Sequence, residues 1–370
     1  MMLKVTLVLV VVLCRANAAS ITPAKSADLP YDANNPLPNN GGLSISDGDF
    51  EERGNAPELF EGDIAGIIEP GDSDESIRKK LDRRTKAGVV ANTFKWWNAD
   101  VYYEMSSALT SSERAKVMTA FREFEKTDTV RFYPRSTQTD YIYIQKSDQG
   151  CYAHVGKIGG MQIVNLEAPG CWTHGIIVHE LNHAIGFWHE QSRYDRDSYV
   201  ELNLNNVDSS NHHNFLKYDS GSVTHANTPY DYGSLMHYGK TAFALSSNVW
   251  TIRPKAPWQN REIGQRIQLS PTDIAEINSM YPLCGILYED DAKEGPYSQF
   301  VKNVVANLHP SSYDIFSSAF VRPGCRMTIY SLVNHEGTAT SFTANSGPTY
   351  HWSFVGKPYD NDARSVKCEC

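Results

Sequence analysis

The sequence predicts an α+β fold followed by a small, mostly β-type C-terminal domain. Three observations support this prediction. A capped amphipathic segment at 110–124 precedes three short β-type segments, and a second helical segment at 179–185 carries regularly spaced histidines. After Cys284, β-type runs alternate with turns rich in Gly, Asn and Ser. With 370 residues and 41% hydrophobic content, the chain can form one large domain or two smaller ones.

The first 18 residues form a predicted secretory signal peptide. Lys4 gives a short basic start, Val5 to Leu13 is an apolar run too short to span a bilayer, and Ala16-Asn17-Ala18 has the small-x-small form of a signal peptidase site. The alternative interpretation is a buried N-terminal strand. No later stretch is apolar enough to cross a membrane, so we expect a secreted, extracellular protein.

Residues 19–86 differ in composition from the rest and are expected to form a propeptide. Residues 28–54 are rich in Asp, Asn, Gly and Pro with little apolar periodicity, which is typical of segments that order poorly on their own. The basic tract at 79–86 then offers a cleavage site for a trypsin-like activating protease. The alternative is that this tract is simply a solvated, charged face.

The next region contains the first predicted helix and strands. Thr110 and Glu113 are placed as in a capping box, which predicts a helix start. Apolar residues then follow at helical spacing and are expected in the core: Val117, Phe121 and Phe124. Segments rich in β-branched and aromatic residues predict strands at 129–133, 141–144 and 162–166. A later helix is predicted from Ser270, with Pro271 at its first position and Pro282 after its end.

A group of three histidines and one glutamate predicts a metal site. His179 and His183 are four residues apart and therefore share one face of a helix, with Glu180 beside that face. Gly186 can end the helix because it adopts the left-handed conformation cheaply, and His189 can then return as a third ligand. Three imidazoles leave a fourth position open, as in catalytic zinc sites. By average residue usage this pattern arises by chance in roughly one chain in ten thousand.

Six cysteines remain after the predicted signal peptide, an even number that suggests disulfides in an oxidising compartment. Cys151 and Cys171 flank the loop and strand before the metal segment, and we predict a bond between them. Such a bond stabilises the fold by roughly 3 kcal/mol in the entropic description. The remaining four cysteines, Cys284, Cys325, Cys368 and Cys370, allow three pairings.

The charges exclude some partners. The formal net charge of −9 argues against nucleic acid or an anionic membrane as the main partner. The dense charges at 193–197, beside the metal segment, are expected to form a structural ion-pair network rather than to act in catalysis.

Two separated motifs resemble a known family. His179–His189 with Glu190, followed by Ser234–Tyr238, is similar to the astacin family of zinc endopeptidases, a branch of the metzincins. The resemblance runs from about Ala87 to Cys284 and into the expected propeptide at 19–86, which we call the leader. It implies a two-lobed metzincin-type protease domain with one Zn²⁺ per subunit.

The resemblance also implies roles for individual residues. His179, His183 and His189 match the zinc ligands. Glu180 matches the general acid/base, and Tyr238 matches the tyrosine that stabilises the tetrahedral intermediate.

Three further positions match structural or inhibitory residues of the family. Met236 matches the methionine of the turn beneath the metal, and Glu190 matches the acid that receives the new N-terminal ammonium after activation. In the leader, Phe60-Glu61-Gly62-Asp63 is similar to the family's inhibitory motif. In that motif Asp63 occupies the zinc position otherwise taken by water. The mature N-terminus is expected near Thr85 to Gly88.

The chain departs from the family at one disulfide. Thr129 stands where the family has the first cysteine, while Cys284 remains at the second, so Cys284 is expected to bond into the tail. The expected organisation is therefore a signal peptide at 1–18, an inhibitory propeptide at 19–86, a catalytic domain at 87–284, and a small disulfide-bonded β domain at 285–370.

The tail has a second, fainter resemblance. Cys325–Ser331 together with Asn361–Cys370 is similar to βγ-crystallin-like Greek-key modules, some of which bind calcium. Val366 replaces the last serine of that calcium pattern. The alternative is a small β domain that only supports the catalytic unit.

Together these observations predict a secreted zinc endopeptidase made as a zymogen, with protein or peptide substrates and no nucleic-acid or membrane partner. One alternative is a catalytically spent scaffold that displays a matrix- or glycan-binding tail. Another is a structural zinc protein, which needs a fourth protein ligand. Intact ligands and an intact Glu180 favour the enzyme.

Overall fold

The computed structural model describes residues 59–81, 94–218, 228–289, 297–308, 313, 315–322, 324–344, 350–353, 357 and 363–370. The predicted signal peptide, the Asn- and Pro-rich leader segment, the expected mature N-terminus and Asn361-Asp362 of the tail lie outside these residues. Among the helices that are described, none combines the length and apolar character needed to cross a membrane.

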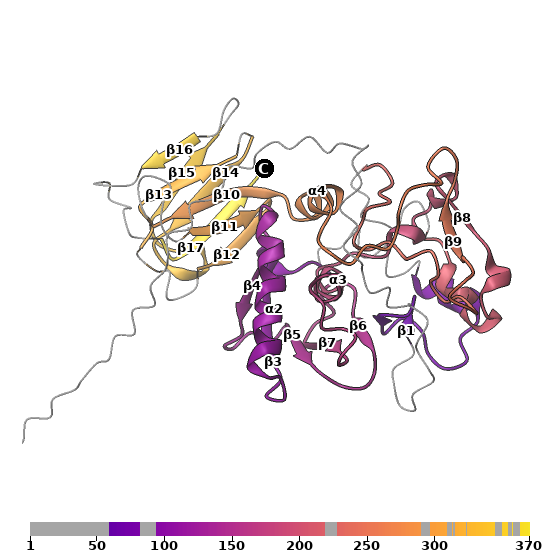
Figure 1. Ribbon diagram of the computed structural model, residues 1–370. Coiled ribbons are helices and arrows are strands. Elements are labelled where there is room, and N and C mark those ends of the chain that lie inside the picture. Colours follow the sequence, from indigo (N-terminus) through magenta and orange to yellow (C-terminus); the bar gives the residue numbers. More distant parts are fainter. Residues whose placement is uncertain are drawn as a thin grey trace, which may run out of the picture. The chain divides into compact units, whose positions relative to one another are not determined.

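A mixed seven-stranded sheet forms the centre of the N-terminal two thirds of the described chain (Figure 1). Its order is β1-β2-β6-β7-β5-β3-β4. The strands are β1 (Leu59–Phe60), β2 (Ile64–Ala65), β3 (Asp100–Met105), β4 (Arg131–Pro134), β5 (Tyr141–Gln145), β6 (Cys151–Ala153) and β7 (Met161–Leu166). Strands β3, β4, β5 and β7 are parallel, whereas β6 runs antiparallel to β7. The leader strand β2 pairs with β6 in parallel, so the leader extends the sheet.

Helices α2 (Ser111–Glu123) and α3 (His174–Ala184) pack against each other, and α3 also contacts β6 and β7. The predicted capping box is present: Thr110 Oγ1 accepts from the Glu113 amide at 3.2 Å, and the Glu113 carboxylate accepts from the Thr110 amide at 2.7 Å. The predicted core residues of α2 are buried between the helices and the sheet. Helix α4 (Pro271–Met280) follows Ser270, the predicted start, and Ser270 forms a capping box with Asp273.

The other described elements are short. Residues 74–81 of the leader are helical. The two-stranded sheet contains β8 (Val200–Leu202) and β9 (Ile252–Pro254). The 3₁₀ helices are η2 (Trp97–Ala99), η3 (Phe124–Lys126), η4 (Glu190–Ser192), η5 (Arg196–Ser198), η6 (Leu204–Asn206), η7 (Ser209–Phe215) and η9 (Val333–His335).

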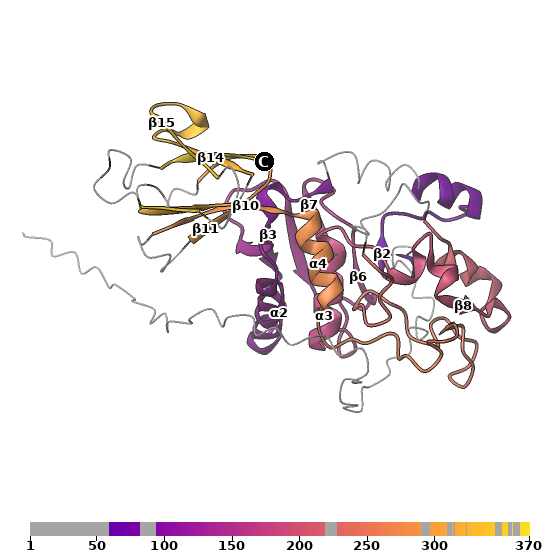
Figure 2. The same ribbon diagram turned by 90° about the horizontal axis from the view of Figure 1, so that it is seen from above.

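The tail is a sandwich of two four-stranded antiparallel sheets, which Figure 2 shows nearly edge-on. Its strands are β10 (Leu283–Tyr288), β11 (Tyr297–Val301), β12 (Val304–Asn307), β13 (Ser318–Val321), β14 (Arg326–Tyr330), β15 (Ala339–Thr343), β16 (Tyr350–Ser353) and β17 (Ser365–Glu369). One sheet has the order β11-β10-β13-β16 and the other β12-β17-β14-β15. Each half of the tail therefore gives its third strand to the other sheet, which interlocks two Greek-key-like units around one core.

Three disulfides are present in the described residues. Cys151 bonds Cys171, as predicted. Cys284 bonds Cys368 and thereby links β10 to β17 across the two tail sheets, which selects one of the three open pairings. The third bond joins the remaining two tail cysteines, Cys325 and Cys370.

The side chain of Asn98, just before β3, hydrogen-bonds to the backbone of the tail strand β11. Its side-chain amide donates to Gln299 O at 2.8 Å and accepts from the Val301 amide at 3.0 Å, so both partners lie on β11. Nearby, the Thr129 hydroxyl donates to Tyr281 O at 2.6 Å. In this chain Thr129 therefore makes a buried hydrogen bond at the position that a cysteine occupies in the family that the sequence resembles.

Replacing Glu113 with Gln tests the first helix cap. The bond from Lys146, together with the bond from the Thr110 amide, lowers the pKa of Glu113 to about 2. A lowered carboxyl pKa contributes stability above the unfolded value near 4.5, and this contribution is lost as pH falls towards about 2. We expect the free energy of unfolding, measured in urea at pH 7, to fall by about 1 kcal/mol. This loss should shrink below about pH 4.5. Glu125→Gln, at an exposed position, is the matched control. A stability difference between the Glu113 variant and the parent that grows as pH falls would contradict this role of Glu113.

Candidate metal centre

Helix α3 and the turn after it bring the three predicted histidines together. His179 and His183 lie on one face of α3, and both are buried. The helix ends at Ala184, and Gly186 has a φ of +119°, a conformation that side chains other than glycine rarely adopt. A Cβ at Gly186 would also lie 3.2 Å from the sulfur of Met280. This turn returns the chain so that His189 faces the other two rings.

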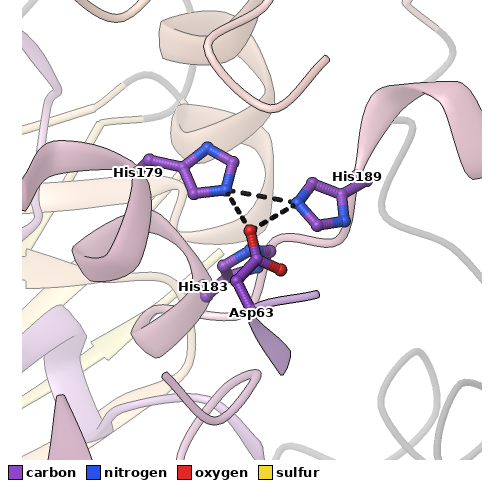
Figure 3. A group of neighbouring side chains, drawn as sticks. All are labelled: Asp63, His179, His183 and His189. Carbon is purple, nitrogen blue, oxygen red and sulfur yellow. Dashed lines mark hydrogen bonds and ion pairs between the residues drawn. The ribbon is translucent and has the colours of Figure 1, made fainter. Parts of the chain in front are cut away.

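The leader residue Asp63 reaches the same point (Figure 3). Its Oδ2 lies 3.0 Å from His179 Nε2 and 3.2 Å from His189 Nε2, and its Oδ1 lies 3.5 Å from His183 Nε2. One ligand atom from each of the four side chains lies within 4.8 Å of the other three. The structure therefore brings together all four residues that the sequence analysis assigned to the metal.

The other ring nitrogen of each histidine faces an oxygen atom. His179 Nδ1 lies 3.0 Å from Leu235 O, His183 Nδ1 2.6 Å from Phe187 O, and His189 Nδ1 2.7 Å from a Glu61 carboxylate oxygen. Carbonyl and carboxylate oxygens only accept, so the proton of each neutral ring belongs on Nδ1. All three Nε2 lone pairs are then free for a cation, which is the arrangement found around bound metals.

The donor set fits a metal ion. Three imidazole nitrogens and one carboxylate oxygen are ligands that suit zinc in a four-coordinate site. Within the described part of the chain, Asp63 Oδ1, His183 Nε2 and Glu180 Oε2 are buried without a hydrogen-bond partner. Buried polar atoms ordinarily have partners, and a cation held by the three histidines and Asp63 would satisfy the first two of these atoms.

Electrostatics at the centre depend on burial and on the Asp63 charge. Burial raises the pKa of Glu180 well above its usual range; the Asp63 carboxylate raises it further, and Arg266 opposes both. For Asp63, burial alone would raise the pKa, but His189, His183 and His179 together hold it well below the ordinary value. The leader therefore places a charged carboxylate beside a carboxyl group that burial favours in its neutral form.

The remaining predicted residues surround the histidines. The Tyr238 hydroxyl donates to Glu61 O at 2.7 Å, so the leader holds this side chain. Met236 is buried, and its carbonyl accepts from the Glu190 amide at 3.0 Å. A Glu190 carboxylate oxygen lies 3.4 Å from Arg193 and accepts from the Asp231 amide at 2.7 Å. Arg193 also pairs with Asp195, so the expected ion-pair network is present.

Sequence reasoning missed several residues that support the centre. Asp273 accepts from Ser234 Oγ at 2.7 Å and from the Leu235 amide at 2.9 Å, and it therefore fixes the turn whose carbonyl faces His179. Burial raises the pKa of Asp273 to about 6. Its only sequence signal was its place in a helix cap. Glu61 was part of the quoted leader motif, but no role was assigned to it.

Comparison with known proteins decides the family. Residues 89–282, more than half of the chain, match the model of the astacin peptidase family. The chain belongs to the astacin family. Zinc metalloproteinase nas-13 of Caenorhabditis elegans is 43% identical over 234 residues, covering 61% of this chain and 50% of the relative. High choriolytic enzyme 1 of Oryzias latipes is 40% identical over 202 residues, covering 51% and 73%.

This astacin-family chain spans about half the length of the nematode relatives nas-13 and nas-14. The solved structure of high choriolytic enzyme 1, a hatching enzyme zinc-protease, aligns with a TM-score of 0.49 and 39% identity, covering 51% of this chain and 95% of that one. A betagamma-crystallin domain from Clostridium beijerinckii aligns with a TM-score of 0.20 and 21% identity, covering 23% and 97%. Both scores are below 0.5, and the strand orders described above define the fold.

Asp273→Asn tests the support of the turn beneath the centre. In Asp273, one carboxylate oxygen accepts from the Leu235 and Ser270 amides, and the other accepts from the Ser234 hydroxyl. The asparagine side chain keeps only one accepting oxygen. One of these two sets of donors therefore loses its acceptor. We expect the free energy of unfolding in urea to fall by about 1–3 kcal/mol, and we expect the variant to retain zinc more weakly. Ser279→Ala, at an exposed position of the same helix, is the control. Unchanged stability in the Asp273 variant contradicts the assigned role.

Proposed function

We propose that this protein is a secreted zinc endopeptidase made as a zymogen. The observation that carries the proposal is the meeting of His179, His183, His189 and the leader residue Asp63, with Glu180 beside them. The zinc metalloproteinases among the relatives support it. The proposed ligands of the mature enzyme are the three histidines, with the Asp63 position open to water and substrate.

In the proposed reaction, zinc supplies Lewis acidity, which lowers the pKa of water and polarises a peptide carbonyl. Glu180 takes the proton of the attacking water. Burial raises the pKa of Glu180, and a raised pKa makes this carboxylate a stronger base. Glu180 then returns the proton to the leaving amine.

Tyr238 is proposed to stabilise the oxyanion that develops on the attacked carbonyl. In the zymogen its hydroxyl donates to Glu61 O, a carbonyl oxygen of the leader. This contact supports the proposal, because it shows that the hydroxyl can donate to a carbonyl of a chain lying in the site.

Latency is proposed to follow from the leader's position. Asp63 occupies the point where three Nε2 atoms meet, and β2 pairs with β6, which would otherwise be the last strand at this side of the sheet. A substrate cannot take this position while the leader remains. Cleavage in the basic tract by a trypsin-like protease would release the leader, and Glu190 is proposed to receive the new N-terminal ammonium. Protein or peptide chains are the proposed substrates.

Glu180→Ala tests the assigned base. We expect trypsin-treated variant protein to keep one zinc per chain but to cleave denatured gelatin at least about 10²-fold more slowly than the parent. Zinc content and gelatin cleavage are measured on the same sample, with the exposed Glu125→Ala as the control. Activity at the parental level would overturn the role of Glu180. Loss of activity together with loss of zinc would show a ligand or folding defect instead.

Asp63→Ala tests the origin of latency. The full-length parent is expected to be inactive on gelatin until trypsin removes the leader, and inactive again when a zinc chelator is added. The variant is expected to show activity while the leader is still attached, because the metal position is no longer occupied by its carboxylate. Glu75→Ala, at an exposed leader position, should remain latent. A latent Asp63 variant would contradict the proposed inhibitory contact.

A further inference from the structure

The three proposed zinc ligands differ in where their Nδ1 partners come from. His179 and His183 use carbonyl oxygens of Leu235 and Phe187, both in the catalytic region. His189 uses the carboxylate of Glu61, which belongs to the leader and is 128 residues away in sequence. Removal of the leader therefore removes the partner of one ligand and leaves the partners of the other two in place.

The structure holds Glu61 at this position by both its backbone and its side chain. The residue is 1% exposed and has a φ of +55°. Its amide donates to Asn214 at 2.7 Å, and its carbonyl accepts from Tyr238. Its carboxylate also accepts from the Tyr218 hydroxyl at 2.6 Å and from the Ser192 hydroxyl.

The glycine after Glu61 makes this placement possible. Gly62 has a φ of +85°, and a Cβ there would lie 2.8 Å from the Phe243 ring. The turn lets Glu61 and Asp63 approach His189 from two sides: Asp63 Oδ2 lies 3.2 Å from Nε2, and the Glu61 carboxylate lies 2.7 Å from Nδ1.

We propose that Glu61 is a positioning residue of the latent metal centre. It fixes the orientation and tautomer of His189 and strengthens this ring as a ligand, as carboxylate partners do for other metal-bound histidines. The leader thus stabilises bound metal twice, once through the Asp63 ligand and once through the Glu61 partner. Activation removes both contacts, so the zymogen retains its metal more strongly than the cleaved enzyme. This inference rests on the proposed zinc zymogen.

The competing interpretation is that Glu61 only anchors the leader. The two roles can be separated, because the Tyr218 hydroxyl bonds the same carboxylate but Tyr218 is not one of the proposed metal ligands. Tyr218→Phe removes one anchoring bond and leaves the bond between Glu61 and His189. Glu61→Gln keeps the size of the side chain but removes its charge and one accepting oxygen.

The experiment uses the full chain carrying Glu180→Ala, so that it cannot process itself. Zinc release to a chromogenic chelator is timed for this parent, for Glu61→Gln, Glu61→Ala and Tyr218→Phe, and for the exposed control Glu75→Gln. Limited proteolysis checks that the leader is still docked. The visible bands of Co²⁺-substituted samples report the ligand environment directly.

We expect both Glu61 variants to release zinc about 10- to 100-fold faster than the parent, with shifted Co²⁺ bands. Tyr218→Phe and Glu75→Gln should remain near the parental rate. Parental release rates in both Glu61 variants would overturn the inference. Equal acceleration by Tyr218→Phe would also overturn it, because leader anchoring would then be sufficient. A parent that binds no stoichiometric zinc would instead refute the proposed function itself.

Discussion

The described structure is organised around the burial of three imidazole rings against one carboxylate. Neutral imidazoles can be buried at moderate cost, but a buried carboxylate needs compensating charge or hydrogen bonds. Asp63 faces three ring nitrogens that carry no proton, so a cation between them would supply this compensation. Each ring is oriented by an oxygen on its far side. These contacts come from the leader, from residues 179–189 and from the turn at 234–238, so three segments distant in sequence meet at the metal position.

Local sequence patterns were sufficient to predict the parts of the site that are close in the chain. The spacing of His179 and His183 is a property of one helix, and the turn at Gly186 is a property of one residue. The Cys151–Cys171 bond was predictable because both residues flank one loop and strand. In the same way, the predicted capping box of Thr110 and Glu113 depends on residues three positions apart.

Contacts between distant segments were not predictable from these patterns. Glu61 has no local feature that marks it as the partner of His189, and Asp273 looks like an ordinary helix cap although it also supports the turn at Ser234–Leu235. Asn98 likewise gives no signal of its pairing with β11. Each of these residues gains its hydrogen-bond partner only when the chain folds and brings a distant donor or acceptor beside it. Short sequence patterns do not contain this information.

The Cys284–Cys368 bond has a consequence for how the tail can be separated from the rest of the chain. The bond joins the first strand of the tail to its last, so every peptide bond between these two cysteines lies inside a covalent ring. A single cut anywhere in that ring opens a loop but releases no fragment. Shedding of the tail therefore requires reduction as well as proteolysis, or a cut before Cys284.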